Sequence, residues 1–264
     1  SVGAAWQVDC QPRRQRGRMI IIALVSPTGG AGRTSLAIAA ATQLNMLGRN
    51  VTLVQADPAN NIEFQLGYSS RSARGLAHVL LQGEPIDQAL NTTSTSFRLL
   101  PFGEVSVAQQ LAIDRVLMEQ PQRLTDLFQQ DEFADDAVVI IDLPRWPAPW
   151  CQKVMALSDL NLITLIPDSA SVLGIDTLLP HLLESRGASY FLMNRFDSAK
   201  VLHLDLWTLC KMKLSHRLLP FYLHEDQALA ESLAAGLALA DYAPRSQLVE
   251  DQQKLCNWID AEIG

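Results

Sequence analysis

The sequence is poor in cysteine and contains no long apolar run. Its four cysteines are scattered over 264 residues without a C-x-x-C pair, so the sequence predicts neither a disulfide scaffold nor a cysteine-bound metal cluster. The five histidines show no metal-ligand spacing. No stretch reaches the roughly 18 apolar residues of a membrane-spanning helix. We therefore expect a cytoplasmic protein with reduced thiols and no direct membrane insertion.

Basic residues are also in the minority, with 21 Lys and Arg against 28 Asp and Glu and a net charge of −7. Non-specific DNA binding needs a basic surface, so no nucleic-acid partner is expected. The 48% of apolar residues is typical of a folded chain, and the length suits one large domain. Residues 1–18 are polar and without periodicity, and we expect them to form a disordered N-terminal extension before a domain over residues 19–264.

Apolar segments that end in turn residues alternate with segments of helical periodicity along the chain. The predicted strands cover residues 19–25, 50–58, 97–103, 137–144, 160–166, 189–195 and 217–223. The predicted helices cover residues 36–47, 74–82, 107–129 with an interruption near Pro121, 171–184, 202–214, 227–235 and 246–263. This alternation predicts an α/β fold with a doubly wound, mainly parallel sheet and helices on both faces. In such sheets ligands bind at the carboxyl ends of the strands.

A glycine-rich turn joins the first predicted strand to the first predicted helix, with the sequence Thr28-Gly29-Gly30-Ala31-Gly32-Arg33-Thr34-Ser35. The backbone N–H groups of such a turn and the following helix N-terminus can hold a phosphate. Thr34 occupies the position of the P-loop hydroxyl that coordinates Mg²⁺, and Ser35 would lie near the α-phosphate. The pattern G-x-x-x-x-G-K-[ST] is broken, because Pro27 replaces its first glycine and Arg33 its lysine. A tight turn without a ligand is the alternative.

Three further polar residues follow or end predicted strands. Asp142 follows four apolar residues, which is the Walker B pattern in which a carboxylate holds the Mg²⁺ ion and its waters. Asp57 could position the attacking water as a catalytic residue, or it could cap the turn that Pro58 begins. Asn194 could pair with the adenine edge through its amide, or it could cap a loop.

Together these features resemble the deviant Walker A ATPases of the MinD/ParA group, with K-G-G-x-G-K-[ST]-[ST] in the loop, D-x-D-P after the second strand and an Asn near the adenine. Both family lysines are missing, since Thr28 and Arg33 occupy their positions, and Gln55 replaces the first Asp of D-x-D-P. Within this group the sequence is similar to the BcsQ (YhjQ) branch encoded in bacterial cellulose synthase operons, whose loop lysines are also altered. That similarity is carried by residues 99–106, 142–145 and 217–236.

The resemblance implies a P-loop NTPase with ATP and Mg²⁺ as cofactors, and an ATP-dependent homodimer. It also implies a role in assembling or localising the cellulose synthesis and secretion machinery. The implied partners are a small BcsR-like protein and the inner-membrane cellulose synthase complex, to which such partners would recruit the chain. A ParA-type protein that partitions DNA or cargo is one alternative, and a degenerate scaffold without nucleotide is the other.

The loss of both lysines predicts slow or negligible hydrolysis, so that the chain would be at most a weak ATPase. Arg33 keeps a positive charge, but its planar fork differs from the compact ammonium of lysine. Thr28 supplies no cation that could cross a dimer to the leaving phosphate. Charge stabilisation is usually the largest catalytic contribution in phosphoryl transfer, and losing one such contact costs about 10²–10³ in rate.

Overall fold

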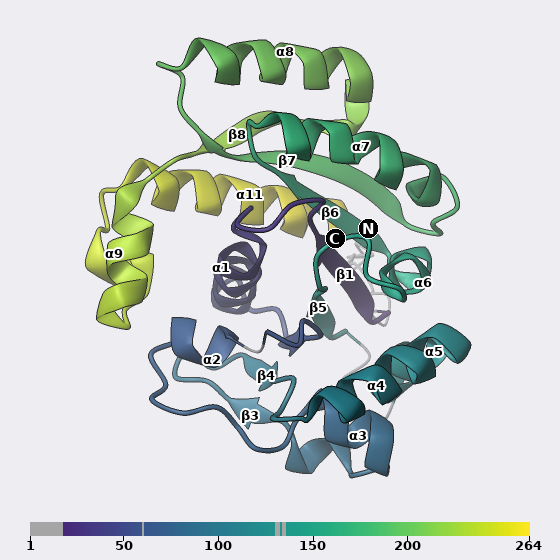
Figure 1. The fold of residues 1–264 in the computed structure, drawn as a ribbon. Coiled ribbons are helices and arrows are strands. Elements are labelled where there is room, and N and C mark those ends of the chain that lie inside the picture. The colour runs from purple at the N-terminus through teal and green to yellow at the C-terminus, as the bar shows by residue number, and fades with distance from the viewer. Residues whose placement is uncertain (1–17, 60, 130–132, 134–135) are drawn as a thin grey trace, which may run out of the picture.

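An eight-stranded sheet lies at the centre of the part of the chain described by the computed structural model, which covers residues 18–59, 61–129, 133 and 136–264 (Figure 1). Its strand order is β3-β4-β2-β5-β1-β6-β7-β8, and every neighbouring pair is parallel except β3 with β4. The strands are β1 (Ile20–Val25), β2 (Val51–Gln55), β3 (Asn91–Thr92), β4 (Arg98–Leu100), β5 (Val138–Asp142), β6 (Leu160–Leu165), β7 (Ala188–Phe196) and β8 (Leu218–His224).

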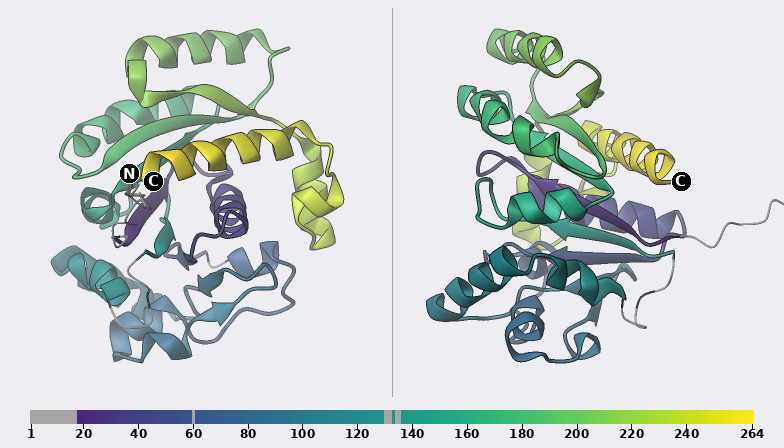
Figure 2. Two further views of the ribbon diagram at one scale, coloured as in Figure 1. Left: turned by 180° about the vertical axis from the view of Figure 1, so that it is seen from behind. Right: turned by 90° about the vertical axis from the view of Figure 1, so that its right-hand side faces the viewer.

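Helices cover both faces of this sheet (Figures 1 and 2). One core packs the sheet against α3 (Leu76–Gln82), α4 (Val107–Glu119), α5 (Gln122–Asp126), α6 (Cys151–Leu157), α7 (Ser169–Leu182) and α8 (Val201–Leu214). The other packs it against α1 (Arg33–Met46), α2 (Ile62–Gln65), α9 (Gln227–Ala235), α10 (Leu239–Tyr242) and α11 (Gln247–Ile263). Residues of β1 alternate between the two cores, Ile21 in one and Ile22 in the other. The predicted doubly wound, mainly parallel fold is thus confirmed.

Several elements differ from the sequence prediction. Helix α1 begins at Arg33, three residues earlier than expected, and Gly32 in the left-handed conformation precedes it. The short elements α2, β3, α6 and α10 and the 3₁₀ turns at residues 86–88 and 215–217 were not predicted, because elements of two to seven residues give little periodic signal. Residues 127–129, the end of a predicted helix, form a 3₁₀ turn. The predicted disordered extension lies outside the described residues, except for Arg18, which donates to Asp159 at 2.7 Å.

The C-terminal helix α11 belongs to the core. Its Leu248, Leu255 and Ile259 are buried beside α1 and β8. No helix in the described part of the chain is long and apolar enough to cross a membrane.

The sheet brings the predicted site residues to one edge. β1 lies between β5 and β6, so the chain crosses to one side of β1 early and to the other side later. A ligand cleft opens at such a reversal point, at the carboxyl ends of the strands. The glycine-rich turn follows β1, Asp57 follows β2, Asp142 ends β5 and Asn194 lies near the end of β7.

Candidate functional site

The glycine-rich turn over residues 28–35 connects β1 to α1 in a conformation that requires glycine. Gly30 and Gly32 have φ angles of 72° and 79°, the left-handed region that side chains disfavour. A Cβ added to Gly32 would lie 2.4 Å from Nδ2 of Asn194, whereas one added to Gly29 or Gly30 would meet nothing within 4 Å. The turn therefore packs closely against β7 at Gly32 and faces open space at Gly29 and Gly30.

Two hollows meet at this turn. The first, of about 340 Å³, is lined by the whole turn together with Ser26, Asp57, Asn61, Gln65 and Arg145. The second, of about 620 Å³, shares Gly30 and Gly32 with the first and is lined on its other sides by β7, the end of β8, α9 and Leu248 of α11. Both volumes are within the range of small-molecule sites.

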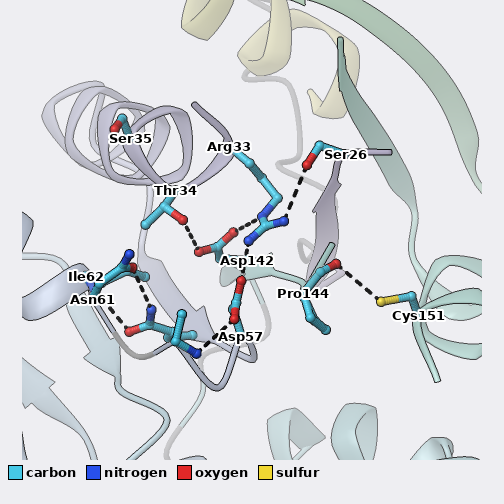
Figure 3. Close-up of polar contacts among 12 residues, drawn as sticks. Ser26, Arg33, Thr34, Ser35, Asp57, Asn61, Ile62, Asp142, Pro144 and Cys151 are labelled. Carbon is cyan, nitrogen blue, oxygen red and sulfur yellow. Dashed lines mark hydrogen bonds and ion pairs between the residues drawn. The ribbon is translucent and has the colours of Figure 1, made fainter. Parts of the chain in front are cut away.

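The guanidinium of Arg33 lies between the two predicted site carboxylates (Figure 3). Its Nε donates to Oδ1 of Asp142 and its Nη2 donates to Oδ2 of Asp57, each at 2.5 Å. Its Nη1 lies 3.4 Å from Oγ of Ser26. Neither of these carboxylate partners was predicted from the sequence.

Burial sets the electrostatics of this group. The Arg33 side chain is 9% exposed and Asp142 is 0% exposed. Burial acts to lower the pKa of Arg33, but Asp142 and Asp57 together hold that pKa above its ordinary value, so the guanidinium stays charged. Burial raises the pKa of Asp142, while Arg33 and the hydroxyl of Thr34 act against that rise. One guanidinium and two carboxylates leave this group with a formal charge of −1.

The two hydroxyls at the start of α1 also have protein partners. Thr34 Oγ1 donates to Oδ2 of Asp142 at 2.8 Å, and Ser35 Oγ donates to Oε1 of Gln65 at 2.9 Å. The side-chain oxygen of Thr28 is buried without a hydrogen-bond partner in the described part of the chain. The fold thus brings Thr34 beside Asp142, as the Walker pattern requires.

The arrangement of these residues does not fit a divalent cation. Thr34 and Asp142 were predicted to hold Mg²⁺, but Asp142 already forms a buried ion pair with the guanidinium of Arg33. An ion at Asp142 would also meet the charge of Arg33. Binding of Mg²⁺ by Thr34 and Asp142 stays a prediction, and this arrangement argues against it.

Asp57 and Asn194 both act within the protein. Oδ1 of Asp57 accepts from the backbone N–H of Ala59 at 2.9 Å, which is the turn-capping role considered from sequence. Its other oxygen accepts from Arg33. Asn194 is buried, and its Nδ2 donates to the carbonyl oxygen of Ala31 at 2.8 Å, which ties β7 to the glycine turn. Asn194 also lines the second hollow. Contact between its side-chain oxygen and an adenine stays a prediction.

Sequence reasoning assigned no role to two residues that shape the site. Arg145 is an exposed cation that lines the first hollow together with the glycine turn. The signal that could have found it is its position three residues after Asp142, at a strand end. Gln65 lies on α2, which is only four residues long and gave no periodic signal.

Pro27, which replaces the first P-loop glycine, packs against α7. A Cβ added to Gly174 would lie 2.4 Å from the Cβ of Pro27. A glycine in α7 therefore makes room for the proline ring, which fixes the entry to the turn.

Comparison with known proteins agrees with this fold. The family model "Cellulose biosynthesis protein BcsQ" matches residues 19–259. The BcsQ protein of Escherichia coli strain K12 is 28% identical over 248 residues, which cover 91% of this chain and 94% of that protein. The chromosome-partitioning ATPase Soj of Thermus thermophilus is 26% identical over 255 residues, 94% of this chain and 98% of that protein.

Among solved structures, the septum site-determining protein MinD of Pyrococcus horikoshii, complexed with Mg-ADP, superposes with a TM-score of 0.71 and 20% identity. The match covers 92% of this chain and 96% of that one. At this identity the likeness shows the fold, which is that of the MinD/ParA P-loop NTPases. The family match covers nearly the whole described domain, and the chain therefore belongs to the family of the cellulose biosynthesis protein BcsQ.

Proposed function

We propose that this chain is an ATP-binding, MinD-like cytoplasmic protein that helps to assemble or localise the bacterial cellulose synthesis and secretion machinery, with slow or negligible ATP hydrolysis. The observation that carries the proposal is the glycine turn, which is open to a hollow while its arginine is tied to both site carboxylates. The glycine turn is open to a phosphate, as in a P-loop. The charged groups that would take part in hydrolysis are instead bonded within the protein, because Arg33 pairs with both Asp57 and Asp142.

The two hollows suit the two ends of a nucleotide. The backbone N–H groups of the turn and the N-terminus of α1 would hold phosphates in the first hollow, with Arg145 as a further cation. The second hollow begins at Gly30 and Gly32 and contains Asn194, whose amide oxygen could accept from the adenine amino group.

Slow hydrolysis follows from the contacts of the acidic residues. A catalytic carboxylate orients water through its acceptor sites, and each oxygen of Asp57 already accepts one hydrogen bond from the protein, one of them from the charged Arg33. Neither family lysine is present to stabilise charge on the leaving phosphate. The chain would therefore hold ATP in a long-lived homodimer rather than turn it over.

The partners proposed are a small BcsR-like protein and the inner-membrane cellulose synthase complex, which would recruit the chain to the membrane. The relationship to Soj allows a partitioning role, but the net charge of −7 disfavours the DNA-binding surface that such a role uses. The second candidate function is a scaffold that binds no nucleotide. It is favoured by the way in which Arg33, Asp57 and Asp142 satisfy one another without a ligand.

ATP turnover by the purified protein tests the proposal. We expect bound ATP and a rate far below about one per second, the low end of ordinary enzymes. A rate at or above that value would refute slow hydrolysis, and a protein that retains no ATP would favour the empty scaffold. Deleting the gene in its host should reduce secreted cellulose and leave plasmid and chromosome segregation intact, whereas the reverse pattern would favour the partitioning role.

A further inference from the structure

The cation that neutralises Asp142 is part of the chain. Asp142 is fully buried, and a buried carboxylate needs a counter-charge or a proton. Nε of Arg33 supplies that charge at 2.5 Å, and the same guanidinium also bonds Asp57. A Mg²⁺ ion bound directly to Asp142 would have to displace a guanidinium that two carboxylates hold at once.

Arg33 also keeps donors for a ligand. A guanidinium has five N–H donors in a rigid fork, and the contacts with Asp142, Asp57 and Ser26 engage three of them. Arg33 lines the first hollow together with the glycine turn. Remaining N–H groups can therefore donate to a phosphate oxygen, a pairing for which the planar fork is well suited.

We propose that Arg33 takes the place of the divalent cation, so that this chain binds a nucleoside triphosphate without Mg²⁺. The inference rests on the proposed nucleotide site and specifies what that site requires. Arg33 neutralises Asp142 beside the triphosphate and donates to it, which are two tasks that a bound metal would perform. The backbone N–H groups of the turn and the exposed Arg145 supply the rest of the positive potential.

The test is an equilibrium titration of ATP by calorimetry in Mg²⁺ and in excess EDTA, on the full chain. The wild type should bind ATP with dissociation constants within about threefold of each other in the two buffers. In an Arg33→Lys variant a compact ammonium replaces the planar fork that fits both carboxylates, which weakens the hold on Asp142, so Mg²⁺ should tighten ATP binding by about tenfold or more. Arg49→Lys is the matched control, because Arg49 pairs with Asp260 of α11 and does not line either hollow.

Wild-type binding that weakens by about tenfold or more in EDTA would overturn this inference and leave the proposed function standing. Absence of ATP binding in both buffers would overturn the proposed function itself. If Arg33→Lys fails to fold, the affinity of the wild type for ATP in Mg²⁺ and in EDTA still tests the inference. A titration of the wild type with Mn²⁺ alone, monitored by electron paramagnetic resonance, tests it independently. That titration should show no protein-bound Mn²⁺, and tight binding at one site would contradict the inference.

Discussion

Replacing Arg33 with methionine should lower the free energy of unfolding by about 3 kcal/mol, because Asp142 would be left buried without its counter-charge. Neither side chain is well hydrated, since Asp142 is 0% exposed and Arg33 is 9% exposed. Removing one partner of a buried ion pair typically costs about 3–5 kcal/mol. We expect the lower end, because Thr34 still donates to Asp142 and the carboxyl can take up a proton.

The pH dependence of this loss has a definite sign. Burial raises the pKa of Asp142, and without Arg33 the main opposing influence is gone. The folded variant would then hold a proton at pH values where the unfolded chain has lost it, so its stability falls as the pH rises. The loss of unfolding free energy caused by Arg33→Met should therefore be largest at neutral pH. It should shrink as the pH falls through the raised pKa of Asp142 in the folded variant toward the ordinary aspartate range.

Urea denaturation at neutral pH, followed by circular dichroism, measures the loss. A cycle of Arg33→Met, Asp142→Leu and the double variant should give a coupling of about 2 kcal/mol, because the double variant leaves no unpaired charge at Asp142. For a chain of this size a loss of about 3 kcal/mol lowers the thermal midpoint by roughly 6–12 °C. An Arg33→Met protein within about 1 kcal/mol of the wild type, or strictly additive single losses, would refute the reasoning.

Three other predictions concern the turn, the thiols and a surface ion pair. Gly32→Ala should abolish ATP binding measured by calorimetry, because its Cβ would collide with Asn194 at 2.4 Å in a left-handed backbone, and unchanged affinity would show that the turn is not the site. In a Cys10→Ser variant, a thiol reagent at pH 8 should not label the native protein, because burial raises the pKa values of Cys151, Cys210 and Cys256 to between about 11 and about 12. The same reagent should label all three cysteines in denaturant. Glu225→Gln should lower the thermal midpoint at neutral pH, because hydrogen bonds from two cations hold the pKa of Glu225 below its ordinary range. That difference should vanish as the pH falls through the acidic glutamate range, and a pH-independent difference would exclude the ion pair as its cause.

The regular elements and the place of the site could be predicted from local patterns. Short, Val- and Ile-rich apolar runs such as residues 137–141 favour buried strands, and a glycine turn after the first strand indicates where the cleft opens. Short elements such as α2 could not be predicted, because four residues do not complete a periodic pattern and α2 is defined by its packing against α1.

The partners of individual side chains were beyond sequence reasoning. Arg33 follows Gly32 in the chain, but its direction depends on Asp57 and Asp142, which are distant in sequence and meet only in the folded sheet. A lysine motif with arginine substituted suggests a phosphate contact, whereas the planar fork instead bridges two carboxylates. The packing of Pro27 against Gly174 is likewise a contact between segments that are distant in sequence.

Native mass spectrometry of the freshly purified full chain tests the central claim, that this P-loop holds ATP without turning it over. We predict a dimer that carries one unhydrolysed ATP per chain and keeps it after exchange into a buffer with EDTA. A monomer with an empty site, or a dimer that contains only ADP, would contradict the account.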